Sequence, residues 1–240
     1  MSKKRGTHGP VYNHRDAPGP QKLVRGEPAR IEAITDHIEK HVGPVAQVFH
    51  EQLSPIVHVD VHHVAPSPRR PFHTLVTSGM SERPMTVPKG AELCRRAELF
   101  LLLRPEWQVS MEAFKDENNY WPMRLLKDLA RLPHEHQTWL GPGHTVTNGM
   151  PPEPYAPSAA YCGALLTNPL SLGADFETLQ TAGGERINFW QVLPLYAEEM
   201  DLKVKHGADA LLDLLNRYRV PDIIAPHRRN ACHDPARIVH

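Results

Sequence analysis

Residues 97–103 constrain the fold of this chain most strongly. They read A-E-L-F-L-L-L, which is apolar at every position except Glu98, and Arg104-Pro105 ends the run. A short apolar run of this kind is typical of a central strand that is covered on both faces. The sequence therefore predicts a sheet flanked by helices, with this segment inside it.

Other segments show the period of two that is expected of strands. Val57, Val59 and Val61 alternate with His58, Asp60 and His62, which predicts a strand over 56–64 with one apolar face. The remaining expected strands are 72–77, 144–147, 159–166, 176–179 and 186–193.

Helical spacing occurs in four places. Ile31, Ile34 and Ile38 share one face of a helix expected over 29–42, which Gly43-Pro44 ends. A second helix is expected to start at a cap formed by Asn118 or Asn119, with Pro122 in its first turn. Its predicted buried stripe is Trp121, Leu125, Leu129 and Leu132, and the last two helices are expected over 195–206 and 208–218. Because strands and helices do not alternate regularly, the pattern favours an α+β fold with a mixed, largely antiparallel sheet flanked by helices.

Composition suggests one domain with unstructured ends. Residues 1–28 are rich in glycine and proline and have little apolar periodicity, so they are expected to form a disordered arm. Residues 29–220 are expected to form the domain, and 221–240, which are polar and interrupted by proline, a flexible tail.

Charge and cysteine content exclude several classes of function. The 27 basic and 27 acidic residues cancel, so no net field attracts nucleic acid or an anionic membrane. No apolar run is long enough to span a bilayer, and no apolar segment follows the basic residues 1–5, so a secretory signal is not expected. Cys94, Cys162 and Cys232 are odd in number and widely spaced, which is typical of reduced thiols and favours the cytoplasm.

Catalytic motifs are weak. The chain has no G-x-S-x-G elbow, and Gly141–Thr145 lacks the residues of a phosphate-binding loop. His58 and His62 flank Asp60 on one face of the expected strand, and imidazoles so placed can bind zinc. A metal-dependent hydrolase built on these three residues, with His144 as a further candidate, is therefore the alternative to a binding protein. It would need further ligands that the sequence does not supply nearby, so no metal or cofactor is expected.

A loop after the second expected strand is the better candidate for contacts with another protein. It spans 78–85 and contains Met80, Arg83 and Met85. Methionine and arginine, when exposed, suit adaptable protein interfaces. The alternative is that both methionines pack into the domain.

Six segments, in the expected order, resemble the bacterial form of the suppressor of fused family. They are V-H-V-D-V at 57–61, T-L-V-T-S-G-M-S-E-R-P-M at 74–85, Y-W-P-M-R-L-L-K-D-L-A-R-L at 120–132, G-P-G-H-T at 141–145, N-G-M-P-P-E-P at 148–154 and I-N-F-W-Q-V-L-P-L-Y-A-E-E at 187–199. The resemblance covers residues 31–218. It implies a mixed α/β domain without enzymatic activity that binds another protein, as the animal member sequesters transcription factors. Related bacterial domains neutralise toxins, so an immunity role is also implied.

The sequence thus predicts a non-enzymatic protein-binding domain that sequesters or neutralises a partner protein, with no nucleic-acid or membrane partner. Strand addition at an exposed sheet edge is the expected mode of binding. The candidate partner-binding residues are Asp60, Ser78, Gly79, Met80, Arg83, Met85, Gly143, His144 and Thr145.

Overall fold

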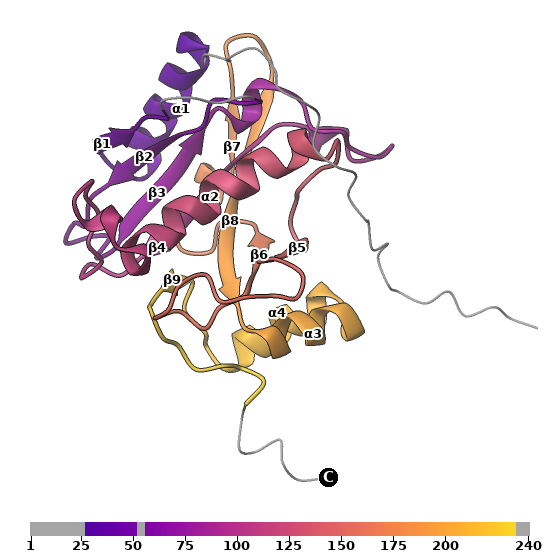
Figure 1. Cartoon of the computed structure of the whole chain (residues 1–240). Helices are drawn as coiled ribbons and strands as arrows, with labels where there is room; N and C mark the ends of the chain where they lie inside the picture. Colours follow the sequence, from indigo (N-terminus) through magenta and orange to yellow (C-terminus); the bar gives the residue numbers. More distant parts are fainter. Residues whose placement is uncertain (1–26, 52–55, 234–240) are drawn as a thin grey trace, which may run out of the picture.

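A nine-stranded mixed sheet forms the centre of the molecule (Figure 1). The computed structural model describes residues 27–51 and 56–233. The strands are β1 (Val45–Phe49), β2 (Asp60–Val64), β3 (His73–Ser78), β4 (Ala97–Leu103), β5 (Thr145–Thr147), β6 (Gly163–Thr167), β7 (Thr178–Gln180), β8 (Arg186–Leu195) and β9 (Ile223–Ile224). The α-helices are α1 (Pro28–His41), α2 (Glu117–Glu135), α3 (Ala197–His206) and α4 (Ala208–Arg217).

The strand order is β1-β2-β3-β4-β8-β6-β5, with β7 paired to β8 and β9 paired to β4. Among the strands of the described residues, β4–β8 and β4–β9 are parallel pairs and the others are antiparallel. The predicted α+β class with a largely antiparallel sheet is therefore confirmed.

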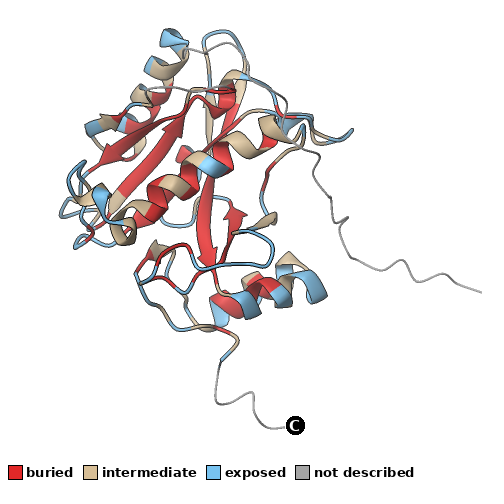
Figure 2. Ribbon diagram, in the orientation of Figure 1, coloured by how far each residue is buried: buried red, intermediate tan, exposed pale blue. Residues whose placement is uncertain are grey.

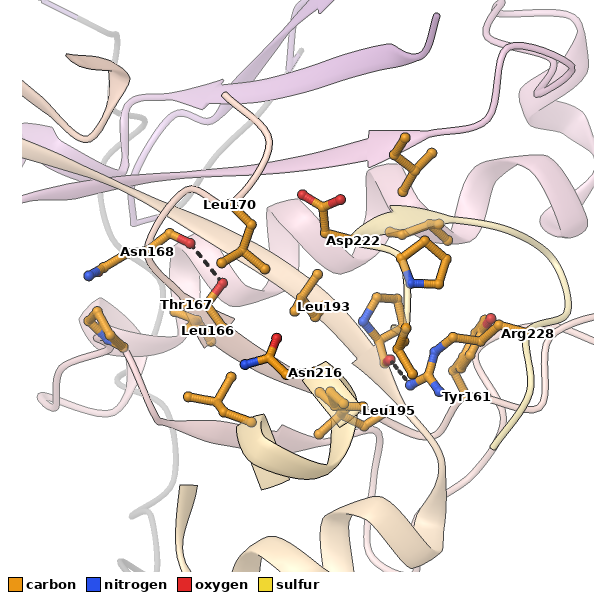
Figure 3. Close-up of a pocket in the computed structure, with 18 of the residues that line it drawn as sticks. Tyr161, Leu166, Thr167, Asn168, Leu170, Leu193, Leu195, Asn216, Asp222 and Arg228 are labelled. Carbon is orange, nitrogen blue, oxygen red and sulfur yellow. Dashed lines mark hydrogen bonds between the residues drawn. The ribbon is translucent and has the colours of Figure 1, made fainter. Parts of the chain in front are cut away.

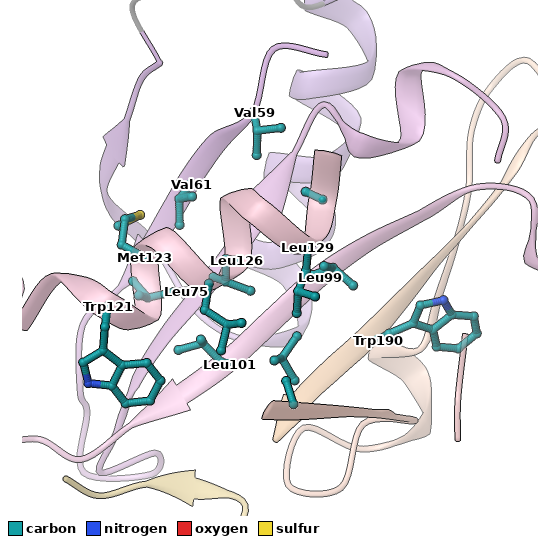
Figure 4. Packing of buried hydrophobic residues seen from close by; sticks show 14 of the residues in the cluster. Val59, Val61, Leu75, Leu99, Leu101, Trp121, Met123, Leu126, Leu129 and Trp190 are labelled. Atoms are coloured by element: carbon teal, nitrogen blue, oxygen red, sulfur yellow. The ribbon is translucent and has the colours of Figure 1, made fainter. Parts of the chain in front are cut away.

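Strand β4 is central, as its apolar run predicts. Its side chains alternate between two cores. Leu99, Leu101 and Leu103 lie on the side covered by α2, whose Trp121, Leu126 and Leu129 pack there (Figure 4). Phe100 and Leu102 lie on the other side, with Ile34 and Ile38 of α1. Figure 2 shows the central strands buried between helices whose outer faces are exposed.

A third core lies where α3 and α4 cover the far end of the sheet. Leu193 and Leu195 of β8 contact Leu211 and Leu215 of α4. Between this core and the α1 core, β8 carries the buried Gln191, whose amide Nε2 donates to the Asp222 carboxylate at 3.0 Å. Helices therefore cover both faces of the sheet. On the face opposite α2, the Gln191–Asp222 hydrogen bond separates the α1 core from the core under α3 and α4.

Glu98, the one polar residue in the β4 run, is fully buried and anchors the turn after β3. Its Oε1 accepts hydrogen bonds from Gly79 N (3.0 Å), Ser81 N (2.9 Å) and Ser81 Oγ (2.6 Å), and its Oε2 accepts one from Thr77 Oγ1 (2.6 Å). Burial raises the pKa of Glu98, and these donors act in the opposite direction.

Several expected boundaries were wrong. Asp116 caps α2 by accepting from Asn118 N, so the helix starts earlier than expected and Pro122 lies inside it. Strand β2 begins at Asp60, not at residue 56. The sequence analysis missed β1, which is short, carries exposed residues at its centre and contains a register shift.

The expected flexible tail also needs correction. Residues 221–233 pack onto the domain, since β9 extends the sheet beside β4 and Tyr161 Oη donates to Ala225 O at 2.9 Å. Arg228 anchors this segment through Glu199. The prediction of a flexible tail failed because a polar, proline-containing composition gives no sign of such tertiary contacts. The expected arm up to residue 26, and the last seven residues of the expected tail, lie outside the described residues.

Candidate functional site

Asp60 is a buried anchor and does not form part of a surface. It is 3% exposed and accepts hydrogen bonds from Glu51 N, His50 Nδ1 and His58 Nε2, each at 2.9 Å. These contacts hold the chain before β2 against the strand. The side chain of Asp60, one of the predicted partner-binding residues, is therefore covered by the domain itself.

His58 and His62, the two histidines of the hydrolase alternative, have different partners. His58 contacts Asp60, whereas His62 Nε2 lies 2.9 Å from Ser78 Oγ. Among residues 27–51 and 56–233, no three His, Cys, Asp or Glu side chains are grouped so that they could hold a metal ion. Ser78 and His62 are both buried, and His62 Nδ1 has no hydrogen-bond partner among the described residues, so this pair lacks the orienting acid of a catalytic triad. The geometry gives no support to the hydrolase alternative.

Burial of two neighbouring histidines makes stability depend on pH. It lowers the pKa of His62 and of His63 to about 4. An unfolded histidine titrates near pH 6.5, so between about pH 6.5 and 4 the unfolded chain binds protons that the folded chain does not. We therefore expect the free energy of unfolding to fall as the pH falls through this window. Urea unfolding from pH 7.5 to 4.5 measures the slope, and His62→Gln should reduce it by about one proton. An unchanged slope in this variant would contradict the burial argument.

The turn after β3 is packed inward. Met80 is fully buried and Met85 is 4% exposed, so the alternative that both methionines pack into the domain is correct. Gly79 has φ +113°, and a Cβ placed there would lie 1.7 Å from His58 O, so only glycine fits. Ser78 is buried too, and only Arg83 of the proposed residues in this turn is exposed. The rigid packing leaves little of this turn free to contact a partner.

The turn at 143–145 lies at the other end of the sheet and is accessible. Gly143, His144 and Thr145 are all half-buried. The His144 ring packs edge-on against Trp139 at 4.3 Å between centroids. Burial and the nearby Lys203 lower the pKa of His144. This turn leads directly into β5.

Strand β5 is an end strand of the sheet and is bonded on one side only. Leu166 N donates to His144 O, and Asn148 N donates to Cys162 O, so residues 144, 146 and 148 face β6. In an antiparallel ladder the intervening residues point their N–H and C=O groups the other way. Thr145 and Thr147 therefore present backbone donors and acceptors on the open side of β5, where no described strand pairs with them.

An exposed methionine lies close to this edge in the sequence. Met150 is three residues beyond β5 and is 90% exposed. The loop that carries it is held by Asn148, whose side-chain Nδ2 donates to Glu153 O at 2.7 Å. The surface roles predicted for Met80 and Met85 from residue type fit Met150 better. Methionine content alone does not distinguish buried from exposed positions.

A cavity of about 300 Å³ lies beside the same turn, with Gly143 in its wall (Figure 3). Its walls come from β6, β8, α4 and residues 220–224. Gly143 is the one predicted site residue in this lining. No local sequence pattern could have indicated the other lining residues, because they come from segments far apart in the sequence.

The other sequence expectations concern membranes and thiols. Within the part of the chain that the structure describes, no helix has the length and apolar character of a membrane span.

Cys94, Cys162 and Cys232 form no disulfide, and burial raises the pKa of Cys162, as expected for an inert core thiol.

Comparison with known families finds one match. A model described as suppressor of fused protein (SUFU) matches residues 56–229, which is more than half of the 240 residues. No curated protein matches the chain.

Solved structures are similar in fold. A SUFU homologue from Neisseria gonorrhoeae has a TM-score of 0.62 and 17% identity, over 84% of this chain and 96% of that one. The Sufu–Fu complex gives a TM-score of 0.56 and 16% identity, over 79% and 85%. Drosophila Suppressor of Fused gives 0.53 and 14%, over 81% of this chain but 48% of its own length. This chain thus spans about half of the Drosophila protein, and at these identities the likeness shows the fold alone.

Proposed function

The chain belongs to the suppressor of fused family, and from that premise we propose that it is a non-enzymatic domain that binds and sequesters a partner protein at the open side of β5. The observation that carries the site is the pair of outward-facing peptide groups at Thr145 and Thr147. An extended segment of a partner would pair with them and add a strand to the sheet, with backbone hydrogen bonds supplying affinity.

Three features support this site over the turn after β3. The β5 edge is accessible, whereas Ser78, Met80 and Met85 are buried. Met150, three residues beyond the strand, is 90% exposed and could offer a partner an adaptable apolar contact. The solved Sufu–Fu complex is of a protein with the same fold in a complex with another protein.

Three finer points belong to the proposal. Three cysteines without a disulfide suit the cytoplasm as its setting. The near-neutral charge of the chain favours a protein over a nucleic acid as the partner. If the partner is a toxin, the role that the resemblance of the sequence implies, its expression without this chain should arrest growth, and coexpression should restore it.

Blocking the β5 edge should abolish partner binding. We expect the double variant Thr145→Lys, Thr147→Lys to weaken binding at least tenfold, because lysines on an edge strand oppose the pairing of a further strand. The tagged protein would be purified gently from its native cells, and bound proteins would be quantified by mass spectrometry for wild type and variant.

The matched control places two lysines on the opposite edge. Ala46→Lys, Gln47→Lys changes two exposed positions of β1 and should leave binding unchanged. Equal recovery of a near one-to-one partner by wild type and by the β5 variant would reject the proposed site. A partner lost equally from both variants would show that added charge, and not the β5 edge, matters.

A further inference from the structure

The cavity beside α4 has the features of a ligand site, and nothing in the proposed binding at β5 uses it. Its floor is buried and apolar, formed by Leu166 of β6, Leu195 of β8 and Ile224 of β9. Its mouth is formed by exposed residues, including Asn168, Leu170 and Asn216 (Figure 3). A concave, mostly apolar site with a few polar groups is typical of small-molecule binding, and about 300 Å³ lies at the lower end of the usual range.

The charged groups in the wall already have hydrogen-bond partners. The Asp222 carboxylate accepts from three neutral donors, Ser171 N at 3.1 Å, Ser171 Oγ at 2.8 Å and Gln191 Nε2 at 3.0 Å. The Arg228 guanidinium forms two hydrogen bonds to the Glu199 carboxylate and one to Pro194 O. An anionic ligand would therefore lose its hydration without meeting a free cation, and it would face the negative charge of Asp222, which is unfavourable.

The neutral polar side chains of the cavity wall differ in whether they have hydrogen-bond partners. Tyr161 Oη donates to Ala225 O, and Thr167 Oγ1 donates to Asn168 O. The side-chain amides of Asn168 and Asn216 have no hydrogen bond to any other described residue. In Figure 3 the Asn216 amide lies among the apolar side chains of the cavity. An amide supplies both a donor and an acceptor, so it suits a hydroxyl or amide group on a ligand.

We propose that this cavity binds a neutral amphiphile: an aliphatic chain that lies on the leucine floor and a hydroxyl or amide head that pairs with Asn216. The volume accommodates about ten non-hydrogen atoms, taking roughly 30 Å³ for each water-sized group. The ligand is thus the size of a medium-chain alcohol or amide.

Three probes with the same chain and different heads test the inference. 1-Octanol, octanoate and octylammonium would be titrated into the full chain, and the methyl signals of Leu193, Leu195 and Leu215 would be followed by NMR. We expect saturable shifts at these methyls with 1-octanol and a dissociation constant at least tenfold lower than for octanoate. No saturable shift up to the solubility limit of 1-octanol, equal affinity for 1-octanol and octanoate, or tighter binding of octylammonium than of 1-octanol would overturn the proposal.

Variants separate the cavity from nonspecific binding. Leu212→Trp fills the cavity from α4 and should weaken 1-octanol binding at least tenfold, and Leu170→Asp at the exposed rim should weaken it without affecting folding. Leu93→Asp, at a position 69% exposed outside the cavity, is the matched control and should change nothing. Asn216→Leu should weaken binding by about threefold to tenfold, the range expected for one hydrogen bond. Unchanged binding in both Leu212→Trp and Leu170→Asp would also overturn the proposal.

Discussion

Replacing Arg228 by methionine is expected to lower the free energy of unfolding by about 3–5 kcal/mol, the usual cost of removing one partner from a buried ion pair. Its guanidinium lies 2.7 and 2.5 Å from the two oxygens of Glu199, which is fully buried. It also lies over the rings of Tyr161 and Tyr196 at 5.5 and 5.0 Å. Without Arg228, the buried carboxylate would keep the backbone donors Tyr196 N and Ala231 N but would have lost its bidentate cation.

Urea unfolding of wild type and variant measures this effect. Arg217→Met changes an exposed arginine at the end of α4 and should cost less than 0.5 kcal/mol, as is usual for surface substitutions. The double variant Arg228→Met, Glu199→Met should be more stable than Arg228→Met alone, because it removes the unpaired charge. A loss below about 1 kcal/mol in Arg228→Met would mean that residues 221–233 contribute little to the stability of the domain.

Replacing Glu98 by leucine should destabilise the domain by more than about 4 kcal/mol. Four donors from Thr77, Gly79 and Ser81 would lose their acceptor in a fully buried site, and each unsatisfied group costs about 1–3 kcal/mol. Glu98→Gln keeps one oxygen but places an NH₂ group against donors, so we expect an intermediate loss.

The same urea experiment measures these two variants. Glu106→Leu, at an exposed position just after β4, is the control and should have little effect. If Glu98→Leu were as stable as Glu106→Leu, the turn at 78–82 would not depend on the carboxylate. The hydrogen bonds to Glu98 would then not be what holds Ser78 and Met80 inward.

The sequence predicted the layered core well, because apolar periodicity reports burial directly. The central position of β4, the Ile34 and Ile38 face of α1 and the α+β class all follow from such patterns. Apolar periodicity failed to predict burial where polar side chains are buried with hydrogen-bond partners. His62 and Asp60 alternate with valines as an exposed face would, yet each is buried with specific partners.

The candidate site was predicted only in part for a similar reason. Thr145 and His144 were predicted as partner-binding residues of a turn, but the open side of β5 depends on strand order, which no local pattern specifies. Met80 and Met85 could not be distinguished from Met150 by residue type. The cavity depends on the return of residues 220–224 to the sheet, a contact between segments far apart in the sequence.

Amide hydrogen exchange at β5 tests directly whether a partner binds at the open side of this strand. Once a partner is recovered, exchange at Thr145, Val146 and Thr147 would be measured for the free domain and for the complex. Strand addition predicts that the outward amides of Thr145 and Thr147 exchange at least tenfold more slowly in the complex, while Val146, already bonded to β6, changes little. Unchanged exchange at Thr145 and Thr147 in a complex that is otherwise intact would contradict binding at this edge.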